Sequence, residues 1–167
     1  LDVEGGRQPL YSEDGKVAVI VNGEIYNFQP LRVELERAGR RFATRSDSEV
    51  VVHGYEEWGD AVLERLEGMF GLAIWDVKRK RLVLARDAFG IKLAYYKIKN
   101  GALHFGSEIR AIRAAGSEKG EVDPVSLNLF LRYRFTPSPY TIYKGINKLA
   151  PGTMLIAEAG STRVQRW

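Results

Sequence analysis

Apolar residues follow two different spacings in the first part of the chain. Residues 17–21 form an unbroken apolar run (VAVIV) of mostly β-branched side chains, which predicts a buried strand. Asn22-Gly23 follows at once and is typical of a turn, since both residue types tolerate positive φ. From Pro30 the apolar positions alternate with Arg and Glu up to Gly39. This predicts a helix with Pro near its start and Gly at its end.

The middle of the chain predicts a second helix and a pair of strands. Ser46 followed by Glu49 has the spacing of an N-terminal capping box, and the helix is expected to stop at Gly59. Residues 69–75 (MFGLAIW) are nearly all apolar, and after a short polar turn residues 82–85 are apolar again. These two runs predict a hairpin of central strands that is covered on both faces.

The second half of the chain continues with hairpins and helices. Asn100-Gly101 is a strong short turn signal and predicts a hairpin around it. A helix is expected over residues 107–115, and another begins with Asp123 as N-cap and Pro124 at its first position. The last strand-like segments comprise residues 152–160 and 162–167.

The fold class follows from the order of these elements: strand, two or three helices, four strands, two helices and two strands. Neighbouring strands mostly pair as hairpins. We therefore predict an α+β fold with antiparallel sheets and helices on their outer faces, rather than a doubly wound parallel sheet.

Composition agrees with one packed domain and excludes some kinds of chemistry. The 167 residues are 45% hydrophobic, which is ordinary for a protein with an apolar interior. There is no cysteine, so disulfides, thiolate metal sites and a cysteine nucleophile are excluded within these residues. No apolar run approaches the length of a membrane span, and no signal-peptide pattern opens the sequence.

Charge and known short motifs add little. The net charge of +4 is weak evidence for nucleic-acid binding, and the basic run at residues 78–81 has the character of solvated loop charge. His53 and His104 lack the spacing of a metal-binding pair, so no metal site is expected. A P-loop and a G-x-S-x-G motif are both absent.

Three short stretches are candidates for chemistry, each with a purely structural alternative. Asn22-Gly23 is either a simple turn or a pair of donors, a side-chain amide and a backbone N–H, for an oxyanion hole. Asp47 either favours the positive end of a helix or binds a ligand ammonium group. Arg86-Asp87 is expected to be a structural ion pair and turn. Local sequence does not separate these alternatives.

Several stretches taken together resemble one known family. The chain is similar, over nearly its whole length, to the glutaminase domain of glutamine-hydrolysing asparagine synthetases, which are class II glutamine amidotransferases. The motifs NGEIYN and RDxFGIK are specific to that group. The matching stretches, in order, are GGRQPLYSEDG, VNGEIYNF, RSDSEVVVHGYEEWG, LEGMFGLAIWD, LARDAFGIKLAYY, FGSEIRAI and YTIYKGINKLAPGTML.

The resemblance implies a fold and a site. The fold would be like that of N-terminal-nucleophile hydrolases, with two stacked, mainly antiparallel sheets between helical layers (αββα). Asn22 and Gly23 would form the oxyanion hole. Glu24 and Asp47 would line the glutamine pocket, with Asp47 pairing with the α-ammonium group of the substrate. A cysteine at the mature N-terminus would attack the glutamine amide, and the ammonia released would serve the ATP-dependent amidation of aspartate to asparagine.

The sequence also departs from the family pattern. We expect a fragment at both ends: residues 1–167 would be a partial glutaminase domain, incomplete at the N-terminus, without the cysteine segment and without the C-terminal ATP-dependent synthetase domain. Such a chain should be inactive alone and should be marginally stable, oligomeric or completed by the missing segments. Leu93-Ala94 stands where the family usually has Pro-Leu, which affects the local loop conformation.

The implied cofactors and partners follow from this assignment. No cofactor is expected in this segment, whereas ATP and Mg would belong to the absent synthetase domain. Glutamine and the missing parts of the parent chain are the expected partners, together with a possible second copy of the chain, and neither nucleic acid nor a membrane is expected. A cytoplasmic location is expected.

Two other functions stay open at this point. One is an amidotransferase with the same glutaminase layout and a different acceptor, such as a sugar or a peptide. The other is a catalytically dead glutamine-binding or regulatory module. The upstream and downstream sequence of the parent gene would distinguish them.

Overall fold

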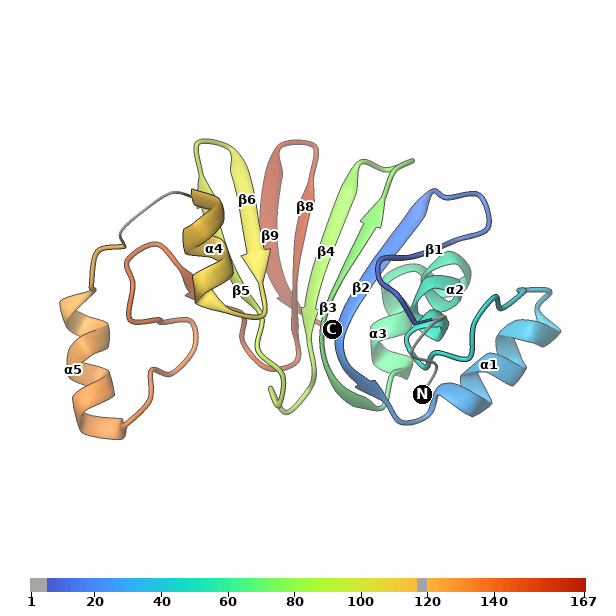
Figure 1. Ribbon diagram of the computed structural model, residues 1–167, viewed down its shortest axis with the longest axis horizontal. Coiled ribbons are helices and arrows are strands. Elements are labelled where there is room, and N and C mark those ends of the chain that lie inside the picture. Colours follow the sequence, from blue (N-terminus) through green and yellow to red (C-terminus); the bar gives the residue numbers. More distant parts are fainter. Residues whose placement is uncertain (1–5, 117–119) are drawn as a thin grey trace.

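Two antiparallel sheets are stacked face to face between helices (Figure 1). The computed structural model describes residues 6–116 and 120–167. The larger sheet has six strands in the order β1 (Leu10–Tyr11), β2 (Val17–Ile25), β3 (Gly68–Asp76), β4 (Arg81–Arg86), β8 (Thr153–Glu158) and β9 (Ser161–Arg166). The smaller sheet has the order β6 (Ala102–Gly106), β5 (Tyr95–Lys99) and β7 (Asn147–Lys148).

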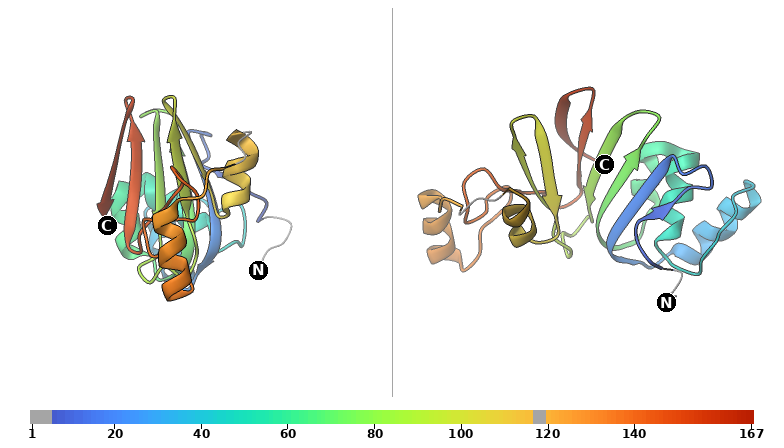
Figure 2. Two further views of the ribbon diagram at one scale, coloured as in Figure 1. Left: turned by 90° about the vertical axis from the view of Figure 1, so that its left-hand side faces the viewer. Right: turned by 45° about the horizontal axis from the view of Figure 1, so that its top comes forward.

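Helices cover the outer faces of this pair of sheets. On the large sheet lie α1 (Phe28–Arg37), α2 (Glu49–Trp58), a 3-10 turn (Gly59–Ala61) and α3 (Val62–Arg65). The small sheet carries α4 (Ile109–Gly116) on the side that faces away from the large sheet (Figure 2, left). The layers are therefore α, β, β and α, and the predicted fold class is confirmed.

The alternation of side chains along the central strands creates two apolar clusters. On the helical face, Val19 and Val21 of β2 pack with Val51 of α2. On the other face, Ala73 and Leu84 pack against the small sheet. The central strands are thus covered on both sides, as their nearly continuous apolar sequence predicts.

Helix α5 (Pro124–Tyr133) lies apart, at the end of the molecule opposite α1 (Figure 1). Its N-terminus is capped as predicted, because the Asp123 carboxylate accepts the N–H groups of Val125 and Ser126. The apolar side chains of the helix are nevertheless exposed, with Leu131 at 68%. Among the described residues, no helix is long and apolar enough to span a bilayer.

The predicted turn at Asn22-Gly23 is wrong. Strand β2 runs through both residues to Ile25 and pairs them with β3, Asn22 opposite Gly71 and Gly23 opposite Phe70. The glycine serves a close approach of the two strands instead of a positive φ. A Cβ at Gly23 would lie 2.0 Å from the carbonyl oxygen of Met69.

Two further expectations need correction, and a third is confirmed. The 78–81 run is not wholly solvated, because Arg81 is buried and donates to both carboxylate oxygens of Asp60 at 2.8 and 2.5 Å. Strands β1 and β7 were not predicted, since two residues give no detectable period. The hairpin at Asn100-Gly101 is confirmed, with φ of 51° and 77° at these two residues.

Candidate active site

Three stretches of sequence meet at one end of the large sheet. The loop before α2 reaches the end of β2, where the Asp47 carboxylate accepts the N–H of Ile25 at 2.8 Å. The loop after β4 reaches the end of β3, where Phe70 exchanges hydrogen bonds with Asp87. Since Phe70 lies opposite Gly23, both loops border the Asn22-Gly23 segment.

The hydrogen bonds of Phe70 show which way the main chain of β2 faces. Its carbonyl accepts from the Asp87 N–H at 2.8 Å, and its own N–H donates to the Asp87 carboxylate at 3.3 Å. Phe70 therefore faces β4, and Gly23–Phe70 is a non-hydrogen-bonded pair of the antiparallel ladder. The N–H of Gly23 consequently points to the edge of β2 that lies away from β3.

Two neighbours on that edge are already occupied. The Gln8 side-chain amide accepts from Val21 N–H at 2.6 Å and donates to Val21 O at 2.8 Å, as a neighbouring strand would. The Ile25 N–H is held by Asp47. Gly23 lies midway between them. Among residues 6–116 and 120–167, its N–H takes part in none of the hydrogen bonds on this edge, so it is a donor available to a ligand.

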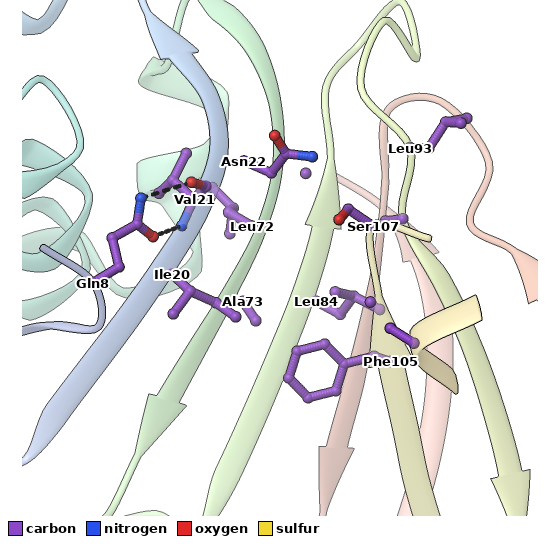
Figure 3. A pocket seen from close by; sticks show the side chains of 14 residues that line it. Gln8, Ile20, Val21, Asn22, Leu72, Ala73, Leu84, Leu93, Phe105 and Ser107 are labelled. Atoms are coloured by element: carbon purple, nitrogen blue, oxygen red, sulfur yellow. Dashed lines mark hydrogen bonds between the residues drawn. The ribbon is translucent and has the colours of Figure 1, made fainter. Parts of the chain in front are cut away.

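The Asn22 side chain points into a cavity of about 270 Å³ between the two sheets (Figure 3). The walls are mainly apolar and include Ile20, Ala73, Leu84 and Phe105, with Gln8 and Ser107 adding polar groups. The exposed Asn22 amide thus lines the cavity, and the next residue, Gly23, has its N–H on the edge of β2. A side-chain amide and a backbone N–H are the kinds of donor that an oxyanion hole uses.

Asp47 has a different role from a helix cap. The residue is buried, with 5% exposed, and its carboxylate joins the loop to β2. Helix α2 begins at Glu49, and the N-cap Ser48 forms no capping bond with its side chain. The predicted capping box is wrong, because the Glu49 carboxylate accepts the N–H groups of Ala43 and Thr44 instead.

Comparison with known proteins identifies the family. A family model described as glutamine amidotransferase domain matches residues 1–167. The chain belongs to this glutamine amidotransferase family.

Curated relatives of the domain are longer proteins. Asparagine synthetase [glutamine-hydrolyzing] 3 of Bacillus subtilis (strain 168) is 38% identical over 171 residues, which is 100% of this chain and 28% of that protein. Asparagine synthetase [glutamine-hydrolyzing] 2 of Arabidopsis thaliana is 44% identical over 113 residues, covering 67% of this chain and 19% of that protein. The amidotransferase domain therefore spans about a quarter of the length of such relatives.

Solved structures support the same fold. Glutamine phosphoribosylpyrophosphate amidotransferase from B. subtilis, solved with ADP and GMP, superimposes with a TM-score of 0.68 at 22% identity. The match covers 95% of this chain and 31% of that chain. At this identity the comparison shows the fold alone, and it agrees with the α, β, β, α layers of the amidotransferase domain.

The remaining predicted site residue of the amidotransferase domain is Glu24. It is exposed and lies two positions after Asn22, so both side chains project from the same face of β2. Among the described residues it forms no hydrogen bond or ion pair. The structure therefore brings Glu24 near Asn22 without fixing its carboxylate.

Arg86-Asp87 organises the loop after β4. Asp87, with 0% exposed, accepts four main-chain N–H groups, and the Arg86 guanidinium donates to three carbonyls. Burial lowers the pKa of Arg86, although the Asp87 charge opposes this. The predicted turn is confirmed, and the side chains bind the main chain instead of each other. The loop leads to Leu93, which lines the cavity, and to Ala94, which is buried.

Two contributors to this region escaped sequence reasoning. Gln8 matches a stretch of the family pattern but carries no chemical signal that predicts a bond to Val21. Trp167 stacks on Phe70 with ring centroids 5.9 Å apart, and its Nε1 donates to Arg86 O at 3.2 Å. Both contacts join positions far apart in sequence, which local patterns do not reveal.

A metal site is not formed within the described part of the chain, where no three potential ligands converge. His53 is buried instead between two carboxylates, with Nδ1 3.0 Å from Glu56 Oε2 and Nε2 3.4 Å from Glu49 Oε1. Desolvation opposes the charged imidazole, but Glu49 and Glu56 outweigh it and raise the pKa of His53.

Proposed function

We propose that this domain binds and hydrolyses glutamine within a glutamine-dependent asparagine synthetase. The observation that carries the proposal is the available Gly23 N–H, which lies on the open edge of β2 beside the Asn22 amide and the Asp47 carboxylate. The curated relatives are named as glutamine-hydrolysing asparagine synthetases, which supports asparagine formation over amidation of a sugar or a peptide.

Each residue has a chemical task in this proposal. Asn22 Nδ2 and Gly23 N–H donate to the oxygen that becomes negative when the glutamine amide is attacked. Asp47 accepts the α-ammonium group, and this pairing selects an amino acid over a plain amide. Glu24 lines the same pocket on the face of β2 that Asn22 occupies.

The spacing of these groups suits glutamine. Gly23 and Ile25 are two strand residues apart, a separation of about 6.8 Å. Asp47 lies 2.8 Å from the Ile25 nitrogen. An extended glutamine has a similar length between its α-amino nitrogen and its side-chain amide oxygen, which supports contact of one molecule with both residues.

The nucleophile has to come from outside these residues, because the 167 residues contain no cysteine. The proposal therefore concerns the full-length parent protein, in which an N-terminal cysteine supplies the thiolate. ATP and Mg would belong to the remainder of that protein. The 167-residue chain alone is expected to show no glutamine turnover.

Asn22→Ala in the full-length parent tests the oxyanion role. Loss of one donor is expected to lower kcat for glutamine hydrolysis roughly 10²- to 10³-fold. Asn27→Ala is the matched control, because the Asn27 amide binds Arg65 O and Glu67 N–H and serves the fold. Steady-state glutamate release decides the question, and wild-type turnover in Asn22→Ala would exclude the role.

Asp47→Asn separates the two tasks of Asp47. The amide oxygen still accepts the Ile25 N–H, but the negative charge is lost. We expect KM for glutamine to rise about 100-fold, as for a lost charge-assisted contact, with little change in melting temperature. An unchanged KM in this variant would show that Asp47 only joins the loop to β2.

A further inference from the structure

The loop that carries Asp47, residues 41–48, has no helix or strand of its own. Its shape is fixed by a side chain that follows it. Glu49, the first residue of α2, is buried with 4% exposed and turns its carboxylate back toward the loop. One oxygen accepts the Ala43 N–H at 2.7 Å, and the other accepts the Thr44 N–H at 2.8 Å and the Thr44 hydroxyl at 2.6 Å.

A hydrogen-bond relay extends from this carboxylate to the neighbour of Asp47. The Thr44 hydroxyl that donates to Glu49 also accepts the Ser46 N–H at 3.0 Å. The main chain on the N-terminal side of Asp47 is therefore set by Glu49 through Thr44. Bonds of this kind to a buried carboxylate are short and strong, so they define one loop conformation.

His53 supports Glu49 from one helical turn away. Its ring lies between Glu49 and Glu56, and Phe42 of the loop packs edge-on against it with centroids 4.6 Å apart. Arg40 approaches Glu56 at 3.6 Å, so the outer carboxylate is also paired. The buried Glu49 and His53 therefore join α2 to the loop.

We propose that Glu49 and His53 are positioning residues for Asp47. Through Thr44 and Phe42 they hold loop 41–48 in the one shape that places the Asp47 carboxylate at the end of β2, beside the Gly23 donor. The inference rests on the proposed function, since it gives Asp47 the task of binding the glutamine α-ammonium group. Neither residue touches the substrate.

Kinetics of Glu49→Gln in the full-length parent test the inference. The neutral amide accepts with one oxygen only, so the loop loses an anchor. We expect KM for glutamine to rise about tenfold with kcat changed less than about twofold, because the displaced group binds substrate and does not act on the reacting bond. Glu34→Gln is the control, since Glu34 pairs with Arg65 on the exposed face of α1. This variant is expected to have the KM of the wild type.

Amide exchange provides a readout that needs no activity. The Ile25 N–H donates to Asp47, so its protection reports where that carboxylate lies. In Glu49→Gln of the same full-length protein, Ile25 is expected to exchange at least about tenfold faster, and in Glu34→Gln at the wild-type rate. If both KM and Ile25 exchange remain at wild-type values in Glu49→Gln, the positioning role is overturned.

The two proposals fail in different ways. Faster Ile25 exchange in Glu49→Gln, together with an unchanged KM in Asp47→Asn, would keep the positioning role and remove the ammonium-binding role of Asp47.

If Glu49→Gln does not fold, Thr44→Val and Thr44→Ser decide. The valine lacks the hydroxyl relay and should raise KM and Ile25 exchange, whereas the serine keeps the relay and should restore both. Equal values in these two variants would also overturn the inference.

Discussion

The loop after β4 and the last residues of strand β2 use their polar groups in opposite ways. After β4, Asp87 is fully buried, and it and Arg86 spend their hydrogen bonds on the main chain of their own loop and its neighbours. At the end of β2, Asn22 is exposed, and the Gly23 N–H points to the open edge. The difference teaches that a polar motif is a better candidate for a binding site when its hydrogen-bond donors have no partner within the folded protein.

The largest effect should come from Asp87→Ala. The substitution leaves four N–H groups, one buried and three part-buried, without their acceptor, so we expect the free energy of unfolding to fall by roughly 4 kcal/mol. Denaturant unfolding of the full-length protein measures it. Asp87→Asn keeps an acceptor and should lose less. A loss below about 1 kcal/mol would contradict the view that the Asp87 carboxylate satisfies the main-chain N–H groups of this loop and so stabilises it.

Gly23→Ala is the next test, because it affects the strand that carries the open donor. The new methyl group would meet Met69 O at 2.0 Å and force β2 and β3 apart. We expect a loss of roughly 2–3 kcal/mol in unfolding free energy. Gly116→Ala is the control, since no atom of residues 6–116 and 120–167 beyond its chain neighbours lies within 4 Å of a Cβ there. Equal stability of the two variants would show that the close approach is not required.

The loop that carries Asp47 should show an intermediate effect that depends on pH, because Glu49 and His53, which hold this loop, gain or lose a proton as the pH changes. Burial raises the pKa of Glu49, but bonds from His53, Thr44 and the Ala43 N–H outweigh this and lower it to about 2. The pKa of His53 is raised. The stability from Glu49 is present above its ordinary pKa of 4.5 and is lost as the pH falls toward 2. That from His53 is present below 6.5 and is lost as the pH rises through its raised pKa.

The melting temperature should therefore be highest between pH 4.5 and pH 6.5, and should decline toward both more acid and more alkaline pH. His53→Gln should remove the decline on the alkaline side and leave the acid decline in place. A thermal scan series across pH measures both. An alkaline decline that is identical in His53→Gln would assign it to other groups.

The smallest effect on stability should come from Asn22→Ala. The side chain is exposed and forms no described hydrogen bond, so the free energy of unfolding should change by no more than about 0.5 kcal/mol. The same variant is expected to have the large kinetic effect described above. A stability loss comparable to that of Asp87→Ala would show that Asn22 and Asp87 are equally important for the fold and remove the contrast between them.

Much of the fold follows from local sequence. The apolar runs at β3 and β4, the Asn100-Gly101 hairpin and the Asp123 cap are all determined by neighbouring residues, and the structure confirms them. Short edge strands are different, because the two residues of β1 and of β7 are defined by pairing with another strand, the neighbouring β2 and the distant β5.

The errors at the site have the same cause. Asn-Gly favours a turn by itself, but pairing with β3 extends β2 through it, and the missing Cβ of Gly23 allows that pairing. Ser46 and Glu49 have capping-box spacing, but the loop main chain at Ala43 and Thr44 competes for the Glu49 carboxylate. Tertiary contacts decide these positions, so the sequence predicts which residues gather and not how they bond.

The position of Trp167 has a practical consequence for spectroscopy. Its indole lies against Phe70 and Arg86 O, directly behind the strand positions that border Gly23 and Asp87. The other two tryptophans, Trp58 and Trp75, belong to α2 and β3. A protein in which both are replaced by Phe would retain within this domain a single tryptophan, next to the candidate site. Its emission would then report, without any added label, how tightly the two loops are packed.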